Sequence, residues 1–235
     1  MDKIKNILCT GGSGYVGTWM ERTKPDNVFL VRQNHEHYEE NWDYGSWDYI
    51  IHLAPISPDR VIDYCQHKHI KFLFASSGAV YEGKGEYANN KRDWERRCEA
   101  SGVDHVICRL FATSGLPFQK NKALSIFIQN ALERKPIQLW GKGDTVRSYL
   151  YGEDVGRTFW EMLLEKDGVC DVGSVIPYTM LEIAKMVGRR IPINIEFIEH
   201  EEMPTPTRYL PKYTDCVAET VGLKEALERM IQNVS

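Results

Sequence analysis

The segment Ile7–Gly17, which reads Ile-Leu-Cys-Thr-Gly-Gly-Ser-Gly-Tyr-Val-Gly, constrains the fold more than any other stretch of the chain. It starts as a short apolar run typical of a buried strand, continues into closely spaced glycines, and leads into residues Tyr15 to Glu21, which favour a helix. A glycine turn between a strand and a helix lets backbone approach a pyrophosphate and points the helix N-terminus at it. The segment therefore predicts a dinucleotide-binding loop. A glycine-rich turn without a ligand is the alternative interpretation.

Further segments predict an α/β fold without help from the glycine motif. Apolar strands are predicted at 27–32, 48–55 and 71–75, with an amphipathic helix at 59–69. The apolar residues in these runs are continuous rather than alternating, which is typical of parallel strands buried on both faces. We therefore expect a Rossmann-like, doubly wound parallel sheet, and 235 residues are enough to bury such a core.

The second half of the chain predicts a small C-terminal α/β lobe that would bind substrate. We expect helices at 121–134 and 178–187 and strands at 137–140 and 191–198 in this lobe, and a further strand at 148–151. Asp154 is placed to cap the helix that follows it. The expected division is a Rossmann domain of 1–113 plus about 145–173, and a lobe of about 114–144 plus 174–235.

Composition narrows the class of protein. A net charge of −4 argues against a nucleic-acid-binding domain, and no apolar run approaches the length of a membrane span. The glycine loop starts so early that we expect no cleavable signal peptide. The cysteines are scattered without a Cys-x-x-Cys pair, so we expect reduced thiols in a cytoplasmic protein. They are Cys9, Cys65, Cys98, Cys108, Cys170 and Cys216.

Arg32 stands at the end of the second predicted strand, where NAD-binding folds carry an acid for the ribose 2′-hydroxyl. An arginine suits a 2′-phosphate instead, through paired charge-assisted hydrogen bonds. The residue therefore favours NADP over NAD as the cofactor. The alternative is a solvent-facing charge with no role in binding.

Two serines and a Tyr/Lys pair are candidates for chemistry. Ser76 and Ser77 end the strand at 71–75, where ligands sit in doubly wound sheets, although serine also favours plain turns. Tyr87 and Lys91 share one face of the next helix, at 87–100. An ammonium near a phenol lowers the tyrosine pKa, and such a tyrosine exchanges protons near neutral pH. Read alone, the pair is also a common surface arrangement.

Histidines and acids in polar segments do not predict a metal site. His35 and His37 alternate with acids, and residues 199–202 read Glu-His-Glu-Glu, but neither set has a sensible further ligand. We expect solvated loops in both places. His52 lies in an apolar strand, and we expect it to be a core residue whose hydrogen bonds are satisfied.

Taken in order, the motifs resemble one family. The segments concerned are Thr10–Gly17, Ile51–Ala54, Ser76–Tyr81, Tyr87 with Lys91, Cys108–Phe111, Trp140–Tyr151 with Asp154, Asp171–Ser174, Arg208–Pro211 and Val221–Leu223. They resemble the extended short-chain dehydrogenase/reductases, the NAD-dependent epimerase/dehydratase family that acts on nucleotide sugars. The likeness spans nearly the whole chain.

The resemblance implies roles for individual residues. Tyr87 would be the general acid/base, Lys91 would lower its pKa and hold the nicotinamide ribose, and Ser77 would hydrogen-bond the reacting sugar group. Arg147 would meet the substrate diphosphate, unless it forms only a surface salt bridge. The implied cofactor-binding residues are Gly11, Gly12, Ser13, Gly14, Tyr15, Val16, Gly17, Arg32, Leu53, Ala54, Ser76, Tyr87 and Lys91, and the implied substrate-binding residues are Ser77, Gly78, Arg147 and Arg208.

The chain also departs from the family pattern. The stretch between Arg32 and Asp48 lacks room for the usual helix and third strand, and Ala112 or Thr113 replaces the family asparagine. Gly78 and Ala79 stand where 4,6-dehydratases carry an acidic pair, which argues against dehydratase chemistry.

The expected activity is therefore that of an NAD(P)-dependent epimerase or 4-ketoreductase acting on a nucleotide-activated sugar. An NADPH-dependent reductase of another small carbonyl is one alternative, and a non-catalytic NAD(P)-binding sensor or scaffold is another. In the family, the helices corresponding to 59–69 and 87–101 pack against a second subunit. Their mixed, charged composition here leaves a homodimer as an open question.

Overall fold

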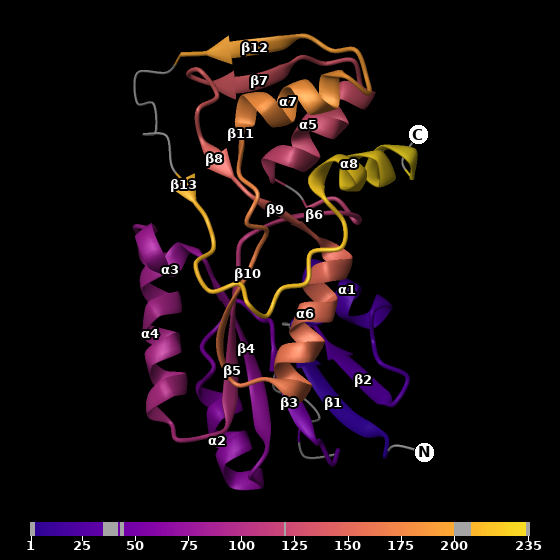
Figure 1. The fold of residues 1–235 in the computed structure, drawn as a ribbon. Helices are drawn as coiled ribbons and strands as arrows, with labels where there is room; N and C mark the ends of the chain where they lie inside the picture. The colour runs from indigo at the N-terminus through magenta and orange to yellow at the C-terminus, as the bar shows by residue number, and fades with distance from the viewer. Residues whose placement is uncertain (1–2, 35–41, 43–44, 120, 200–207, 234–235) are drawn as a thin grey trace.

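The computed structural model describes residues 3–34, 42, 45–119, 121–199 and 208–233. At its centre lies a six-stranded sheet in the order β10-β5-β4-β3-β1-β2, in which every neighbouring pair is parallel (Figure 1). The strands are β1 (Lys5–Thr10), β2 (Val28–Gln33), β3 (Tyr49–His52), β4 (Lys71–Ser77), β5 (His105–Leu110) and β10 (Gly168–Val172). This topology confirms the expected doubly wound, Rossmann-like sheet.

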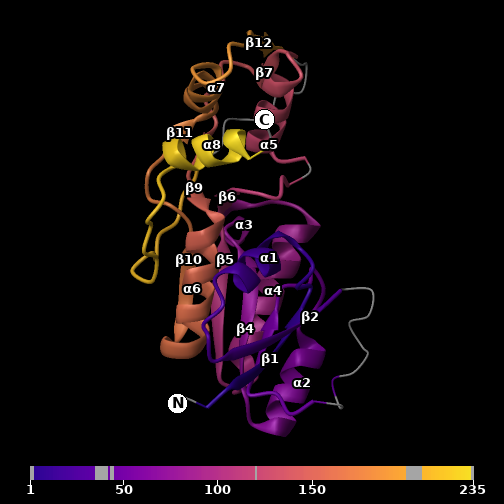
Figure 2. The same cartoon turned by 90° about the vertical axis from the view of Figure 1, so that its right-hand side faces the viewer.

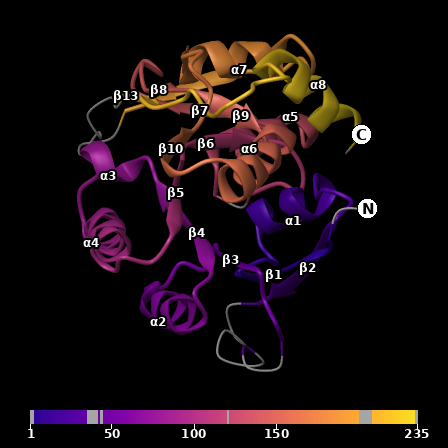
Figure 3. The ribbon, with the colours of Figure 1, turned by 60° about the horizontal axis from the view of Figure 1, so that its bottom comes forward.

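Helices cover both faces of the sheet, because side chains alternate between the faces along each strand. Ile7 and Cys9 of β1 pack in one apolar core, whereas Leu8 packs in another on the opposite face. Figure 3 shows α1 and α6 on one side of the sheet and α2 and α4 on the other. The helices are α1 (Tyr15–Arg22), α2 (Asp59–Lys68), α3 (Ala79–Glu82), α4 (Glu86–Ala100) and α6 (Gly152–Glu165). In the described part of the chain, no helix combines the length and apolarity that crossing a bilayer requires.

Most of the stretch between Arg32 and Asp48, which we expect to lack room for the usual helix and third strand, lies outside the described residues. Strand β2 pairs with β1 alone, and the next strand in the described chain, β3, lies on the other side of β1. In the described residues β2 is therefore the edge of the sheet. The candidate ligands His35 and His37 lie outside the described residues.

A smaller lobe stands on the carboxyl ends of the sheet strands (Figure 2). It has an apolar core of its own, to which Phe127, Ile183 and Leu227 contribute. Its elements are β6 (Ala112–Ser114), α5 (Ala123–Leu132), β7 (Ile137–Trp140), β8 (Val146–Arg147), β9 (Tyr149–Tyr151), β11 (Tyr178–Thr179), α7 (Met180–Gly188), β12 (Ile195–Ile198), β13 (Arg208–Tyr209) and α8 (Leu223–Gln232). The residue numbers at which we expect the two parts to divide stay a prediction.

Residues 208–221, called the strap from here on, leave the lobe at β13, descend to β10 and return to α8 (Figure 1). The backbone N–H groups of Lys212 and Tyr213 donate to Oδ2 of Asp171 at 2.7 and 3.1 Å. Asp171 is fully buried at the end of β10. The strap is therefore fastened to the sheet next to the carboxyl ends of its strands.

Two cysteines correct the expectation of reduced thiols. Cys170 of β10 and Cys216 of the strap form a disulfide, with their Cα atoms 6.3 Å apart. The bond arises because the strap runs beside β10, where Asp171 N–H donates to Tyr213 O at 2.8 Å. The remaining cysteines are free and buried: Cys9, Cys65, Cys98 and Cys108.

Asp154 is a second correction. Helix α6 already begins at Gly152, so Asp154 lies inside its first turn and makes no side-chain cap there. Its carboxylate instead accepts hydrogen bonds from the backbone N–H groups of Thr220 and Val221, both at 3.0 Å. Asp154 therefore fastens the C-terminal end of the strap. The local sequence around Asp154 does not reveal these partners, because they lie more than 60 residues along the chain.

Helix α7 begins at Met180, two residues later than expected. A capping box sets this start, because Thr179 Oγ1 accepts from Glu182 N–H while the Glu182 carboxylate accepts from Thr179 N–H. The residue before the cap, Tyr178, pairs in β11 instead.

Candidate active site

The glycine loop forms a cradle made of backbone. Gly11 has φ of 69°, and a Cβ there would lie 2.6 Å from the backbone nitrogen of Ala54. A Cβ on Gly12 would lie 2.8 Å from Cβ of Arg32, and one on Gly17 would collide with the Gly12 carbonyl. Side chains are therefore excluded at each of these positions, which keeps the loop open for a close-fitting ligand.

Helix α1 starts from this cradle at Tyr15, and Gly14 is its extended N-cap without a side-chain cap. Such a helix start offers backbone N–H groups to an anion. The Tyr15 hydroxyl is directed elsewhere and donates to Ser114 O at 2.6 Å. The backbone at Tyr15, rather than its side chain, thus fits the pyrophosphate of a dinucleotide.

Ser76 adds a second observation that fits a bound group. Its side chain is only 4% exposed, it lines the cavity described below, and its buried hydroxyl has no hydrogen-bond partner among the residues that the structure describes. A buried hydroxyl without a partner is costly unless a ligand or water completes it. The cradle and Ser76 together fit a dinucleotide lying across the ends of β1, β3 and β4.

Arg32 lies beside the cradle at the end of β2, with its Nε 3.5 Å from Oε2 of Glu21 on α1. The guanidinium that was predicted to face a 2′-phosphate therefore has a carboxylate as a neighbour. The pair brings both a positive and a negative group to the place where the second strand ends.

His52 is confirmed as a core residue with satisfied hydrogen bonds. Its Nδ1 shares a hydrogen bond of 2.7 Å with Thr10 Oγ1, and its Nε2 lies 3.1 Å from Ile56 O. Burial lowers the pKa of His52 to about 4, so the imidazole is neutral near pH 7. It buttresses β1 against β3 just below the cradle.

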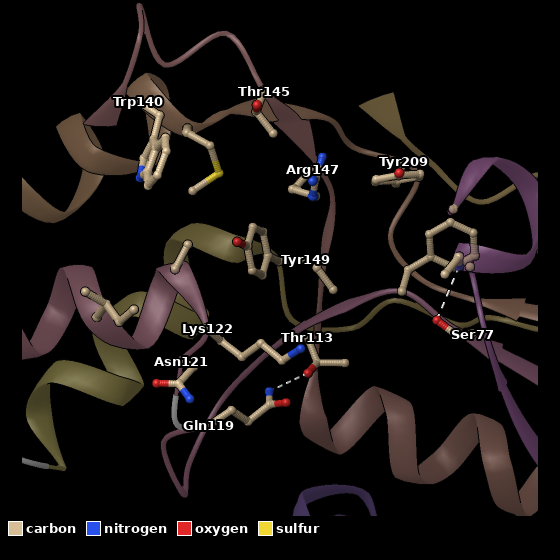
Figure 4. Close-up of a pocket in the computed structure, with 18 of the residues that line it drawn as sticks. Ser77, Thr113, Gln119, Asn121, Lys122, Trp140, Thr145, Arg147, Tyr149 and Tyr209 are labelled. Carbon is tan, nitrogen blue, oxygen red and sulfur yellow. Dashed lines mark hydrogen bonds between the residues drawn. The ribbon is translucent and has the colours of Figure 1, made fainter. Parts of the chain in front are cut away.

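A cavity of about 1000 Å³ lies between the carboxyl ends of β4 and β5 and the lobe (Figure 4). Ser77 and Tyr87 line it from the Rossmann side, and Trp140 and Arg147 line it from the lobe. The Ser77 hydroxyl accepts from Ala79 N–H at 3.2 Å. The structure thus brings five of the predicted residues to one space: Ser76, Ser77, Gly78, Tyr87 and Arg147.

The cavity is positively charged, although the chain as a whole is acidic. Lys84, Lys122 and Arg147 are among the described residues that line it, and none of these lining residues is Asp or Glu. Polar groups such as Thr113 and Gln119 face the same space, and Gln119 donates to Thr113 Oγ1 at 2.6 Å (Figure 4). The lining therefore suits an anionic ligand with hydrogen-bonding groups.

Lys91 takes a different position from Tyr87. Tyr87 is 56% exposed in the first turn of α4, whereas Lys91, one turn later, is only 4% exposed. The Lys91 ammonium donates to Ala75 O at 2.8 Å and lies 4.8 Å from the ring centroid of Phe74. Burial lowers the pKa of Lys91 to about 8. Lys91 is not among the described residues that line the cavity.

Arg208 and Tyr209 are neighbours in the chain but do not line the same cavities. Arg208 is exposed and lines a separate hollow of about 170 Å³ together with Tyr81 and Lys212. Tyr209 lines both this hollow and the main cavity, where Figure 4 shows it beside Arg147. Sequence reasoning singled out Arg208 and missed Tyr209.

A buried polar network next to the cavity was also missed. The Tyr81 hydroxyl donates to Asp171 Oδ2 at 2.9 Å, Arg109 Nη1 donates to the Tyr81 oxygen at 2.8 Å, and Arg109 Nη2 donates to Glu95 Oε2 at 2.8 Å. Burial and then the Asp171 carboxylate raise the pKa of Tyr81 to about 12. The signal available in the sequence was a charged residue in each of two apolar segments, Arg109 and Asp171. The structure makes these two residues register partners in β5 and β10.

Comparison with known proteins identifies the family. The sequence profile of the NAD-dependent epimerase/dehydratase family matches residues 18–173. The chain belongs to this family. The match confirms the resemblance inferred from the motifs and makes the chain an enzyme of the extended short-chain dehydrogenase/reductase type.

Individual relatives are distant. A UDP-glucuronic acid decarboxylase of Danio rerio is 24% identical over 98% of this chain and 73% of its own length. The dTDP-glucose 4,6-dehydratase of Bacillus anthracis, solved in complex with NAD, superposes with a TM-score of 0.83 at 17% identity over 97% of this chain and 96% of that one. The UDP-glucose 4-epimerase of Thermotoga maritima, solved with UDP-glucose, gives 0.81 at 19% identity over 97% and 98%. These structures share the family fold.

Proposed function

We propose that this enzyme binds a nicotinamide dinucleotide and a nucleotide-activated sugar, and interconverts a hydroxyl and a carbonyl on that sugar as an epimerase or 4-ketoreductase. The observation that carries the proposal is the single cavity that Ser77, Tyr87 and Arg147 line together. The glycine cradle lies on one side of this cavity, and the lobe, which contributes Lys122 and Arg147, lies on the other. A sugar between them would meet a proton-transfer group and a diphosphate-binding group at once.

The chain's own residues supply proton transfer and orientation. The Tyr87 phenol would exchange a proton with the reacting sugar hydroxyl, and the Ser77 hydroxyl would hydrogen-bond the same oxygen. Lys91 lies one helical turn from Tyr87, so its positive charge would stabilise the phenolate. A bound nicotinamide would supply the hydride acceptor and donor. Arg147 would hold the diphosphate and so fix the distance of the sugar from Tyr87.

Dehydratase chemistry fits this cavity poorly. Elimination of water needs a further acid and base, and the 4,6-dehydratases carry an acidic pair at the positions of Gly78 and Ala79. A Cβ on Gly78 would lie 2.6 Å from the ring of Phe111, so that position has no room for a side chain unless Phe111 moves. The absence of Asp and Glu among the described lining residues points the same way.

A sugar acid is a second candidate substrate. Several relatives are named UDP-glucuronic acid decarboxylases, and the lining places Lys84 and Lys122 in the cavity in addition to Arg147. Oxidation of a sugar hydroxyl beta to a carboxylate gives a β-keto acid, which loses carbon dioxide readily. The same Ser77 and Tyr87 would then serve the oxidation step.

The cofactor follows from the groups around the cradle. We propose NAD or NADP, held by backbone at Gly11, Gly12 and Gly17. Arg32 favours the 2′-phosphate of NADP, but its neighbour Glu21 weakens that preference and suits a 2′-hydroxyl. Several structures with this fold, including that of the Bacillus anthracis enzyme, were solved in complex with NAD.

The deciding experiment starts with mass spectrometry of the small molecules released from purified protein. Carried-over NAD would support an epimerase that regenerates its own cofactor. Empty protein that prefers NADPH over NADH in a titration would support a reductase. Binding of neither would overturn the proposal. UDP-glucose and UDP-glucuronic acid, each followed for sugar products, separate the substrate candidates.

Tyr87→Phe tests the proposed chemistry. The substitution removes only the phenolic oxygen, so we expect turnover to fall by at least about 100-fold, the typical contribution of a general acid/base. Cofactor affinity should stay within about twofold, because the substitution keeps the aromatic ring and leaves the backbone cradle at Gly11, Gly12 and Gly17 unchanged. Tyr213→Phe, at an exposed tyrosine of the strap, is the matched control. Retained turnover in Tyr87→Phe would show that another group carries the proton.

A further inference from the structure

Arg147 lies on the middle strand, β8, of a small three-stranded sheet in the lobe. Strand β8 lies between β11 and β13, and Arg147 is the register partner of Tyr209 on β13. The guanidinium carbon of Arg147 lies 4.8 Å from the centroid of the Tyr209 ring. Both side chains line the main cavity, and Figure 4 shows them side by side at its upper edge. The tyrosine therefore forms an aromatic platform for the arginine.

The guanidinium is restrained from a second direction. Arg147 Nη1 donates to Val146 O at 2.7 Å. Burial lowers the pKa of Arg147 from its ordinary value, yet an arginine stays charged at any working pH. A long side chain normally loses much rotamer freedom when it binds an anion. Stacking on Tyr209 and the bond to Val146 restrict that freedom before any ligand arrives.

The platform itself is fixed by the strap. Directly after Tyr209, the backbone N–H groups of Lys212 and Tyr213 are held by Asp171, and the Cys170–Cys216 disulfide follows. On the other side, β13 pairs with β8 itself. Tyr209 thus sits on a segment fastened both to the lobe and to the sheet.

We propose that Tyr209 is a positioning residue for substrate binding: its ring orients the Arg147 guanidinium toward the diphosphate of the nucleotide-activated substrate. The inference rests on the proposed function, since it assumes that Arg147 meets a diphosphate. Tyr209 then acts on phosphate affinity through Arg147 and makes no contribution to recognition of the base.

The test measures ligand binding by calorimetry with UDP, dTDP and GDP, and continues with the tightest of these and its nucleoside. Tyr209→Ala should weaken the nucleoside diphosphate by about tenfold, the value of a partly desolvated cation–π contact. Tyr209→Phe should bind within about twofold of the original chain, because it keeps the ring. Affinity for the nucleoside alone should not change in either variant.

A double-mutant cycle separates positioning from direct contact. In an Arg147→Ala background, Tyr209→Ala should cause no further loss of diphosphate affinity. Tyr213→Ala, at a tyrosine of the same strap with 60% exposure, is the matched control and should bind normally. Circular dichroism of each variant verifies the fold.

Two outcomes would overturn the inference, and only the second would also overturn the proposed function. An equal loss from Tyr209→Ala with and without Arg147, or an equal loss of nucleoside affinity, would mean that Tyr209 contacts the ligand itself. Failure of the unmodified chain to bind any nucleoside diphosphate would overturn the proposed function, and this inference with it.

Discussion

At the scale of single residues, Lys91 shows how burial changes a group's chemistry. Its ammonium lies between the rings of Phe74 and Trp94, 4.8 and 5.1 Å from their centroids, and donates to a backbone carbonyl. Desolvation is the largest cause of its lowered pKa, and the nearby Glu95 partly opposes it. The same ammonium is the charge that we expect to tune Tyr87. Lys91 therefore links the stability of the fold to pH.

The lowered pKa of Lys91 predicts a specific pH dependence of stability. Its folded value of about 8 lies below the ordinary value of 10.5, so between these pH values the unfolded chain binds more protons than the folded chain. The free energy of unfolding contributed by this group therefore rises with pH across that window, by up to about 3 kcal/mol. Lys91→Met should abolish this contribution.

Urea unfolding at pH 7 and pH 10 measures the effect. Relative to Lys91→Met, the original chain should gain stability as the pH rises. Lys224→Met, at an exposed lysine of α8, should run parallel to the original chain. Parallel curves for Lys91→Met as well would mean that Lys91 does not change its protonation on unfolding.

At the scale of elements, the sequence predicts what depends on local pattern. Strands β1, β2, β3 and β4 and the helices α1, α2 and α4 follow from apolar patterns and from the glycine loop, because each signal lies within a few residues of the element. Strands β5 and β10 were indicated only by the family resemblance of residues 108–111 and 171–174. The start of α7 was misplaced, because a reciprocal cap at Thr179 and Glu182 outweighs the apolar pattern. Asp154 was misread, because its partners lie in the strap, far along the chain.

The candidate site divides in the same way. Ser77, Tyr87 and Arg147 were predicted because each belongs to a local motif. The network of Tyr81, Arg109 and Asp171 was not, because it forms only when β5, β10 and α3 come together. Which strands become neighbours is decided by the tertiary fold, and one sequence does not reveal it.

The prediction at the scale of elements concerns Asp171, because its carboxylate accepts hydrogen bonds from α3 and from the strap and so connects both to β10. Asp171→Leu would leave two strap N–H groups and the Tyr81 hydroxyl without their acceptor, at a cost of about 3 kcal/mol or more. Asp171→Asn keeps an acceptor oxygen in a side chain of nearly the same shape and should cost much less. Urea unfolding of both variants checks this, and equal losses would contradict the proposed clamp.

At the scale of the whole molecule, the two lobes are joined by more than the chain crossing between them. Strands β6 and β9, which lie where the chain crosses between the lobes, pair with each other in parallel. The further link is the strap, which runs from β13 to α8 across the end of β10. The cavity lies between the lobes, so its shape depends on how firmly they are held together. Asp171, Asp154 and the Cys170–Cys216 bond are the fastenings of the strap.

The disulfide gives a prediction for the molecule as a whole. It closes a loop with a sequence separation of 46 residues, and such a bond typically contributes about 2–4 kcal/mol by restricting the unfolded chain. Reduction should therefore lower the melting temperature by about 5–15 °C. Cys216→Ser should melt at the lower temperature with or without reductant, because it has no bond to lose.

Thiol titration in denaturant should find four free cysteines before reduction and six after it. Six free thiols in the protein as isolated would show that the strap is held by Asp171 and Asp154 alone, and its melting temperature would then not respond to reductant.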